Sequence, residues 1–355
     1  MDFSKYKFRA HSVGKIMGGV PRVLTQDQES TYNSLLAKHK SNNKNLTLAQ
    51  MKRYAYLINK HKDVEKELTE NQKNELFDLI LKYESTGKNL TLNQISTLGD
   101  LHKKKTGTLK LDDTAKSFLE KLVWQELTKR SSDIKSAMID KGLRKEEESI
   151  TLYSNVTNKL FLKNEERKQN EYLSGEYDNS QNETIRDIKT SWSYESFPLR
   201  DDKIKNKDYI WQLDSYMDLW GFKKSELIYC LVHTPFNLLE DEIRSLDYHN
   251  NILTQDGQVR EERIPLVVEL VSNHIYTSNG LNAFCQYSSI VKISWFLDLF
   301  VEIPEEIRIK IFEHKYCEIR NTQMKEMVLL AREYMNFLID SLGDSILKFN
   351  KLKSV

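Results

Sequence analysis

The sequence predicts a mixed α/β fold in which helices flank a central β-sheet, and three observations carry this prediction. Two strand-like segments flank a polar turn within residues 174–191. An amphipathic helix is expected at 208–221, with Tyr209, Gln212 and Tyr216 on one face. The run 226–235 is apolar until Pro235 stops it, which is typical of a buried strand.

The polar turn places charged residues where they can meet. Residues 179–182 form a turn-like run, so we expect 174–191 to be a β-hairpin. Asp187 and Lys189 share a strand face with Ile185, because side chains alternate along a strand. Asp178 enters the turn and can arrive beside Asp187. The same spacing also occurs at ordinary solvated hairpin edges, so by itself it leaves a structural role open.

The composition limits the classes of partner. The formal net charge of +1 over 355 residues means that a nucleic acid would have to be held by a local basic patch. Three well-separated cysteines exclude a four-cysteine zinc or iron–sulfur site within this chain and fit a reducing compartment. No apolar run reaches membrane-spanning length and the N-terminus lacks a signal-peptide pattern, so we expect no membrane partner and a cytoplasmic location.

An internal repeat occupies residues 24–105. Each copy is expected to form two helices, each opened by a capping box in which Thr is followed three residues later by Gln. The region is either an arm for substrate handling or for a partner, or a purely structural arm. The repeated positions, offset by 44, include Leu35 and Leu79, and the four boxes are Thr25–Gln28, Thr47–Gln50, Thr69–Gln72 and Thr91–Gln94.

Two further helices are expected before the hairpin, at 112–129 and 136–156. In the second, Glu146 falls within an apolar stripe formed by Ile139, Leu143, Ile150 and Tyr153. A carboxylate on a buried face is costly unless it is paired or bound to a metal. Glu146 is therefore either the partner of a buried basic residue or a third acidic ligand.

The two ends of the chain carry weaker signals. A short helix capped by Ser12 is expected near the N-terminus, close to Lys5, Lys7 and Arg9, as an ordinary surface helix or as a phosphate contact. After residue 240 the pattern predicts helices at 241–251, 266–276 and 322–347, an apolar stretch at 281–300 and a strand at 307–312.

The order of these elements and residues resembles the PD-(D/E)XK nucleases. Within them the chain is most similar to the phage lambda exonuclease/YqaJ recombinase branch and to RecB-like nuclease domains. The resemblance covers residues 5–20 and 106–235. The motifs that carry it are Gly142 to Glu146, Gly175 to Asp178, Asp187 to Ser191, Gln212 to Tyr216 and, more weakly, Ala10 to Ile16.

The resemblance implies a restriction-endonuclease-like core and a metal-dependent mechanism. Glu146, Asp178, Asp187 and the Ile188 carbonyl would hold Mg²⁺ or Mn²⁺. Lys189 would orient or deprotonate the attacking water, and Gln212 would hold Lys189 or the scissile phosphate. The expected DNA contacts are Ser12, Thr190, Ser191, Trp192 and Tyr216.

The leading expectation is therefore a DNA exonuclease of phage recombination or DNA processing. The alternatives are a structure- or sequence-specific endonuclease and a non-catalytic DNA-binding or structural protein. The resemblance also implies DNA, a homo-oligomer and a single-strand annealing protein as partners, in the host cytoplasm if the protein is phage-encoded. We expect a nuclease core at 1–23 and 106–240, an inserted arm at 24–105 and a C-terminal extension at 241–355.

Overall fold

A computed structural model gives the structure of the protein. It describes residues 1–20, 26–42, 47, 50, 53, 72, 74–79, 91, 94, 97–98, 109–130 and 136–342. The chain divides into two compact units, one formed by Met1–Gly18 with Asp113–Val355 and the other by Gly19–Asp112. Each unit is described below by itself.

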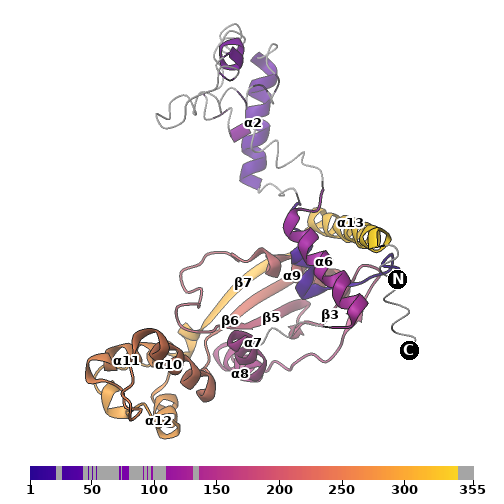
Figure 1. Ribbon diagram of the computed structural model, residues 1–355. Helices are drawn as coiled ribbons and strands as arrows, with labels where there is room; N and C mark the ends of the chain where they lie inside the picture. The colour runs from indigo at the N-terminus through magenta and orange to yellow at the C-terminus, as the bar shows by residue number, and fades with distance from the viewer. Residues whose placement is uncertain are drawn as a thin grey trace. The chain divides into compact units, whose positions relative to one another are not determined.

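The helices and strands of the first unit form a mixed α/β structure (Figure 1). The strands are β1 (Phe8–Arg9), β2 (Lys168–Gln169), β3 (Leu173–Gly175), β4 (Asn179–Gln181), β5 (Thr184–Thr190), β6 (Lys224–Cys230) and β7 (Ile309–Lys315). Its helices are α1 (Ala10–Val13), α6 (Asp113–Thr128), α7 (Ala137–Arg144), α8 (Glu146–Thr157), α9 (Lys207–Trp220), α10 (Phe236–Asn250), α11 (Ile264–Ser272), α12 (Ser278–Tyr287) and α13 (Glu318–Leu342).

The central sheet has the strand order β4-β5-β6-β7, and β5 and β6 are parallel while the two outer pairs are antiparallel. A smaller sheet has the order β1-β3-β2. The helix α9 connects β5 to β6, as a parallel pair requires a crossover.

Helices cover both faces of the central sheet, as predicted. On one face Ile188 packs with Ile150 and Tyr153 of α8. On the other face Ile185 packs with Tyr216 and Met217 of α9. Ile185 and Ile188 thus enter two different hydrophobic clusters on opposite faces of β5, which is why this strand is buried on both sides.

A buried ionic cluster fixes α9 against β7 and α13. The carboxylate of Asp214 is almost completely buried and accepts a hydrogen bond from Arg320 Nε at 2.7 Å. His314 Nε2 of β7 lies 2.9 Å from the same carboxylate. A buried charge is tolerated when it is paired in this way, so the cluster holds α9 in position beside β5.

The hairpin lies where the sequence predicts it, but its turn is shifted. The predicted turn residues 179–181 form strand β4, and the chain reverses at Asn182 and Glu183, which both have positive φ. Two successive positive φ values are those of a tight two-residue hairpin turn. Because Asn179 pairs with Arg186, the same register brings Asp178 opposite Asp187.

The predicted single helix at 136–156 is wrong, because the chain breaks at Lys145 into α7 and α8. The predicted apolar stripe is also wrong in its first half. Ile139 and Leu143 are exposed, Leu143 to 73%, whereas the fully buried side chain of α7 is Lys141. Glu146 therefore begins a helix and does not sit within a continuous buried face.

The predicted cap at Ser12 is also wrong. The helix α1 begins two residues earlier, and its N-cap is Arg9, which makes no side-chain capping bond. The Ser12 hydroxyl instead donates to the Arg9 carbonyl at 2.9 Å.

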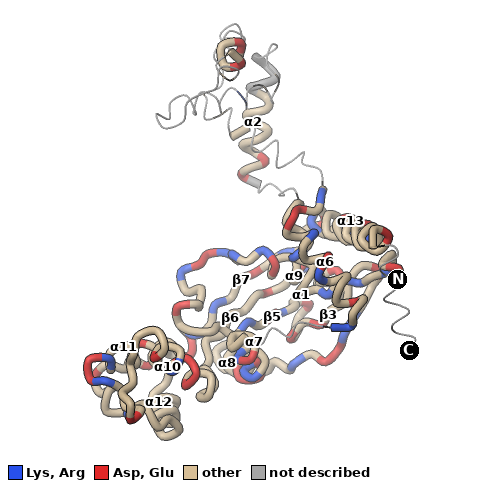
Figure 2. Tube along the Cα trace, viewed as in Figure 1, with Lys and Arg blue, Asp and Glu red and all other residues tan. Residues whose placement is uncertain are grey.

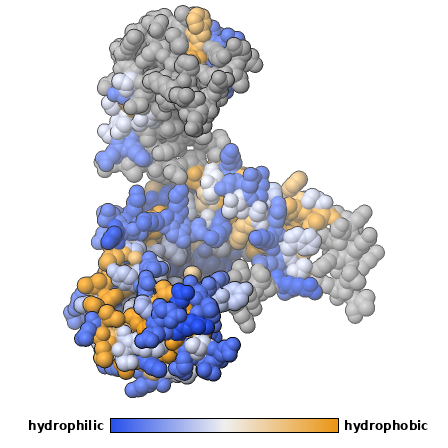
Figure 3. Space-filling view, turned by 60° about the vertical axis from the view of Figure 1, so that its left-hand side comes forward, coloured by the Kyte–Doolittle hydropathy of each residue, from blue (hydrophilic) through white to orange (hydrophobic). Residues whose placement is uncertain are grey.

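The chain after residue 230 contributes to the central sheet as well as to its surroundings. α10, α11 and α12 gather around a separate hydrophobic cluster that includes Leu239, Val271 and Phe284. Figure 3 shows hydrophobic residues among hydrophilic ones on the surface of this segment. β7 then returns to pair with β6, and α13 packs against α6 and α9.

The second unit contains α2 (Gln26–Asn42) and parts of the repeat. The Thr47 backbone N–H donates to Gln50 Oε1 at 3.0 Å, and the Gln50 backbone N–H donates to Thr47 Oγ1 at 3.2 Å. This confirms a capping box there. The pair Thr91 and Gln94 does the same. Leu35 and Leu79, equivalent in the two copies, are both buried. Thr25 and Thr69 of the other two boxes lie outside the described residues.

Acidic and basic residues are interspersed along the first unit (Figure 2), in line with the formal net charge of +1. Within the described part of the chain, no helix combines the length and the apolarity needed to cross a bilayer.

Two glycines test the local backbone. Gly221 ends α9 with φ of 78°, and Gly142 lies inside α7; a Cβ at either would meet nothing within 4 Å. We expect Gly221→Ala to reduce the free energy of unfolding by about 1 kcal/mol, because Ala is strained at positive φ. The matched Gly142→Ala should increase it by up to about 1 kcal/mol, since Ala favours a helix interior. Urea denaturation measures both, and equal effects of the two would contradict the backbone explanation.

Candidate active site

The site is organised around one face of β5. Ile185, Asp187 and Lys189 all face α9, as the alternation of a strand predicts. The opposite face carries Arg186, whose Nε donates to the Tyr153 hydroxyl at 3.1 Å, and Thr190. The charged residues of the candidate site therefore lie between the sheet and α9.

Asp178 reaches this face from the neighbouring strand. It lies directly before β4, and its backbone N–H donates to the Arg186 carbonyl at 3.2 Å. The backbone N–H of Ile188 donates to Asp178 Oδ2. Burial, and then the nearby charge of Asp187, raise the pKa of Asp178 to about 7. Two carboxylates thus occupy adjacent positions in a place with little solvent.

Asp187 is held by two side chains, Gln212 and Lys189. Its side chain is 2% exposed, and its Oδ1 accepts a hydrogen bond from Gln212 Nε2 at 3.1 Å. The same amide group donates to the Tyr216 hydroxyl at 2.8 Å. Lys189 Nζ lies 2.7 Å from Asp187 Oδ2. Gln212 therefore positions Asp187, whereas the resemblance had suggested Lys189 or a phosphate as its partner.

Lys189 is an ammonium ion in this setting. Burial opposes its charge, but the carboxylates of Asp187 and Asp178 outweigh burial and raise the pKa of Lys189 above its ordinary value. The ring of Tyr209 lies 5.1 Å from its Nζ, which further favours the cation. In this state Lys189 can orient a water or a phosphate oxygen by donating to it, and it has no lone pair with which to take a proton.

Glu146 forms an ion pair with Lys163. Its Oε2 lies 2.7 Å from Lys163 Nζ, and both side chains are partly exposed. Its charge still contributes to the raised pKa of Asp178, so it lies in the same neighbourhood. Glu146 is thus the partner of a basic residue in this structure, and that residue is at the surface, not on a buried helix face.

The residues expected to contact DNA are in varied positions. Ser12 and Trp192 are half-buried, and the Trp192 carbonyl accepts from Lys141 Nζ at 2.8 Å. Thr190 contacts the Ser149 hydroxyl at 2.8 Å, on the α8 face. Tyr216 is buried beneath Gln212. Ser191 is also buried, and its hydroxyl has no hydrogen-bond partner among the described residues.

A basic cavity of about 440 Å³ was not found from the sequence. It is lined by Arg9, Arg167, Lys168, Gln169 and Ser174, which come from β1, β2, β3 and the residue before β2. Burial, and then the charges of Arg9, Lys189 and Arg167, lower the pKa of His11. Of the residues that line the cavity, only Arg9 stands out in the sequence, as one of three basic residues near α1. Arg167 and Lys168 lie in a run of mixed charges that has no distinguishing pattern.

Whether the site suits a divalent cation can be judged from its oxygens. Asp187 Oδ2 is buried and receives no hydrogen bond from the described residues, although Lys189 pairs with it as an ion. Within those residues no three His, Cys, Asp or Glu side chains are gathered as a metal site, since Glu146 turns to Lys163. Two adjacent carboxylates, one of which has a buried oxygen paired only with Lys189, nevertheless match the hard oxygen donors that Mg²⁺ and Mn²⁺ prefer.

The pair formed by Glu146 and Lys163 gives a test of the third ligand. If Glu146 turns to the metal, Glu146→Gln should weaken Mn²⁺ binding about tenfold, and the matched Lys163→Met should strengthen it about threefold by freeing the carboxylate. Without metal both variants should melt close to wild type, because partly exposed ion pairs contribute roughly 0–1 kcal/mol. Thermal melts over a Mn²⁺ titration measure this. An unchanged Mn²⁺ response in Glu146→Gln would remove Glu146 from the site.

No family model and no curated protein sequence matches this chain. Among solved structures it is similar to a phage-related exonuclease from Haemophilus somnus 129PT, with 25% sequence identity, 68% of this chain and 88% of that chain covered, and a TM-score of 0.47. It is also similar to an alkaline exonuclease from Laribacter hongkongensis, with 10% identity, 68% and 89% covered, and a TM-score of 0.41. The same enzyme in complex with dAMP has 11% sequence identity to this chain and a TM-score of 0.40, with 69% of this chain and 89% of that chain covered. All three TM-scores lie below 0.5.

Proposed function

We propose that this protein is a metal-dependent DNA exonuclease of the PD-(D/E)XK type that acts in phage recombination or DNA processing. The observation that carries the proposal is the cross-strand pair Asp178 and Asp187 with Lys189 two residues further on the same strand face. Gln212 and Tyr216 support this group from α9. Carboxylates and an ammonium held together with little solvent suit phosphodiester hydrolysis, in which negative charge develops on phosphate oxygens.

Different residues of the chain would have different roles in this reaction. Asp178, Asp187 and the Ile188 carbonyl would hold Mg²⁺ or Mn²⁺, with Glu146 joining after it leaves Lys163. When bound, such an ion stabilises the charge on the phosphate and lowers the pKa of a nearby water. Lys189 would donate to the attacking water or to a phosphate oxygen and orient it, and Gln212 keeps Asp187 in one rotamer.

The basic cavity supports a phosphate-rich substrate. Arg9, Arg167 and Lys168 bring three cations together in one cavity, and the charges of Arg9, Arg167 and Lys189 all act on His11. Guanidinium groups form paired hydrogen bonds with phosphate oxygens. A local basic cavity is also what a chain with a net charge of +1 needs in order to hold DNA.

One assay separates the candidate functions. End-labelled linear duplex and covalently closed circular DNA are incubated with Mg²⁺ and, separately, with EDTA. An exonuclease should degrade only the linear DNA, and only with Mg²⁺. Cutting of the circle would favour the endonuclease, and DNA binding without cleavage of either substrate would favour the non-catalytic protein.

A further inference from the structure

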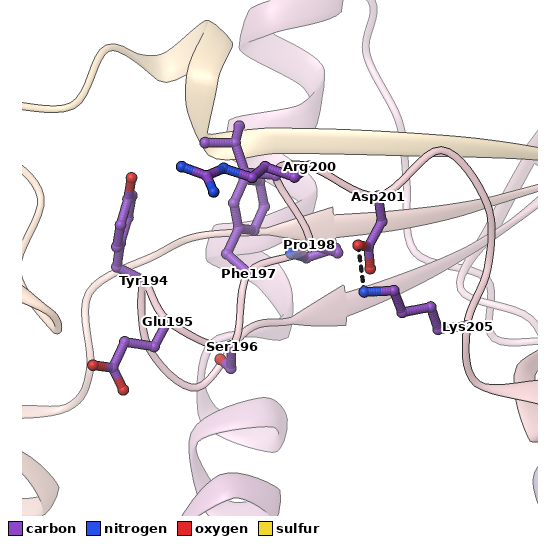
Figure 4. Close-up of a pocket in the computed structure, with 9 residues that line it drawn as sticks. Tyr194, Glu195, Ser196, Phe197, Pro198, Arg200, Asp201 and Lys205 are labelled. Atoms are coloured by element: carbon purple, nitrogen blue, oxygen red, sulfur yellow. Dashed lines mark ion pairs between the residues drawn. The ribbon is translucent and has the colours of Figure 1, made fainter.

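The loop between β5 and α9 encloses a cavity that the proposed site does not use. The cavity has a volume of about 450 Å³, within the range of small-ligand pockets. Figure 4 shows Tyr194 and Glu195 on one side of it and Arg200 and the Asp201–Lys205 ion pair on the other, with the Arg200 guanidinium pointing toward Tyr194. The base of a nucleotide would fit between groups of this kind.

The loop is anchored, so the cavity exists before any ligand binds. The backbone N–H of Tyr194 donates to the Asn273 carbonyl at 2.9 Å. Phe197 is buried against Leu231 and Tyr276. At the other side Lys310 Nζ donates to the Leu199 carbonyl at 3.2 Å. A preformed cavity loses little entropy on binding.

The groups that line the cavity are free to engage a ligand. The side chain of Tyr194 is 43% exposed. Arg200 is exposed, and the described residues supply its guanidinium with no ion pair or hydrogen bond. Asp201 is neutralised by Lys205, whose Nζ lies 2.6 Å from its carboxylate. Glu195 is exposed, and its two carboxylate oxygens can accept hydrogen bonds from an amino group on a base.

Packed side chains join the cavity to the candidate active site. Tyr229 of β6 packs against the hydrophobic cluster that contains Phe197, a residue of the cavity wall. The ring of Tyr229 also lies 6.3 Å from that of Tyr209, which contacts Lys189. A DNA strand whose phosphate lies at Lys189 can therefore continue into the cavity of the loop between β5 and α9.

We propose that this cavity binds one nucleotide unit of single-stranded DNA next to the position of cleavage, with the base stacked on Tyr194 and its phosphate paired with Arg200. The proposal rests on the proposed nuclease function and names a subsite of it. Stacking on an aromatic ring and pairing with a guanidinium are the usual means by which proteins hold single strands without regard to sequence.

Binding of a fluorescein-labelled oligodeoxycytidylate 12-mer in EDTA tests the subsite without cleavage. Tyr194→Ala should weaken binding about tenfold, and Tyr194→Phe, which keeps the ring, should bind within about twofold of wild type. Arg200→Ala should also lower the slope of log Kd against log salt by about 0.7, the value for one lost phosphate contact on a single strand. The controls are Tyr248→Ala, where the tyrosine is 87% exposed on α10, and Arg244→Ala on the same helix.

The outcomes separate this proposal from the proposed function. Wild-type affinity and an unchanged salt slope in the two pocket variants would overturn the subsite, whether or not the protein cleaves DNA. A loss confined to these variants would support it even if no cleavage were found. Competition with dCMP distinguishes the source of the nucleotide: displacement of the 12-mer by dCMP at micromolar concentration would overturn the strand-bound form in favour of a mononucleotide site.

Discussion

Lys189→Ala should reduce DNA cleavage by about 1,000-fold, as expected when a group that stabilises developing charge is removed from a water-poor site. The reason is its position, with Nζ 2.7 Å from Asp187 and both carboxylates raising its pKa. Single-turnover cleavage of linear duplex with Mg²⁺ measures the effect. The DNA affinity should stay close to wild type, because Lys189 is one cation among several.

We expect the stability of this variant to depend on whether a divalent ion is added. Asp187 is about 1% exposed, so loss of Lys189 leaves a buried carboxylate without its cation, which costs roughly 3 kcal/mol or more. A divalent ion should restore much of this loss by supplying the missing charge. Lys159→Ala, at an exposed lysine beyond α8, is the control and should cleave like wild type. Cleavage by Lys189→Ala within tenfold of wild type would show that the lysine has been wrongly assigned.

Lys141→Met should change the pH dependence of stability more than any surface substitution. Lys141 is fully buried on α7, and its Nζ donates to the Trp192 carbonyl at 2.8 Å. Burial, and then the charge of Lys145, lower its pKa to about 7, while Glu148 acts weakly in the opposite direction. An unfolded lysine has a pKa near 10.4, so the folded and unfolded states differ in charge between about pH 7 and pH 10.

The sign of the effect follows from the protons bound. Between pH 7 and about 10, Lys141 is neutral when folded and charged when unfolded, so unfolding takes up a proton and the wild type gains stability as the pH rises. Each unit of pH contributes up to about 1.4 kcal/mol. The variant lacks this term, so its stability relative to wild type should fall by about 3 kcal/mol from pH 7 to pH 10 and should level off below pH 7.

Denaturant unfolding at several pH values measures the difference in the free energy of unfolding between Lys141→Met and the wild type. Lys159→Met, at an exposed lysine, should show the same difference at every pH in this window. A constant difference for Lys141→Met as well would mean that Lys141 remains charged in the folded protein.

Local rules were enough for several parts of this protein. The sequence by itself determined that Asp187 and Lys189 share a strand face, because alternation along a strand needs only two residues. It also determined the end of α9 at Gly221 and the capping boxes at Thr47 and Thr91, since these depend on residues within one turn. The buried strand β6 followed from its composition alone.

Other parts were decided only by tertiary structure. A two-residue turn at Asn182 and Glu183, and not the expected run 179–182, set the register that places Asp178 opposite Asp187. The break at Lys145 moved Glu146 off the expected stripe and toward Lys163, because helical periodicity cannot show where a helix ends without a strong stop signal.

The most distant contacts had no sequence pattern at all. Arg9 meets Arg167 and Lys168 only because β1 pairs with β3 and β3 with β2, and Lys141 is buried only because α7 packs against the loop after β5. Alternation, periodicity and capping report contacts within a few residues of one another. The basic cavity, the burial of Lys141 and the contact of Gln212 with Asp187 join residues 25 to 159 positions apart, so only the folded chain could bring them together.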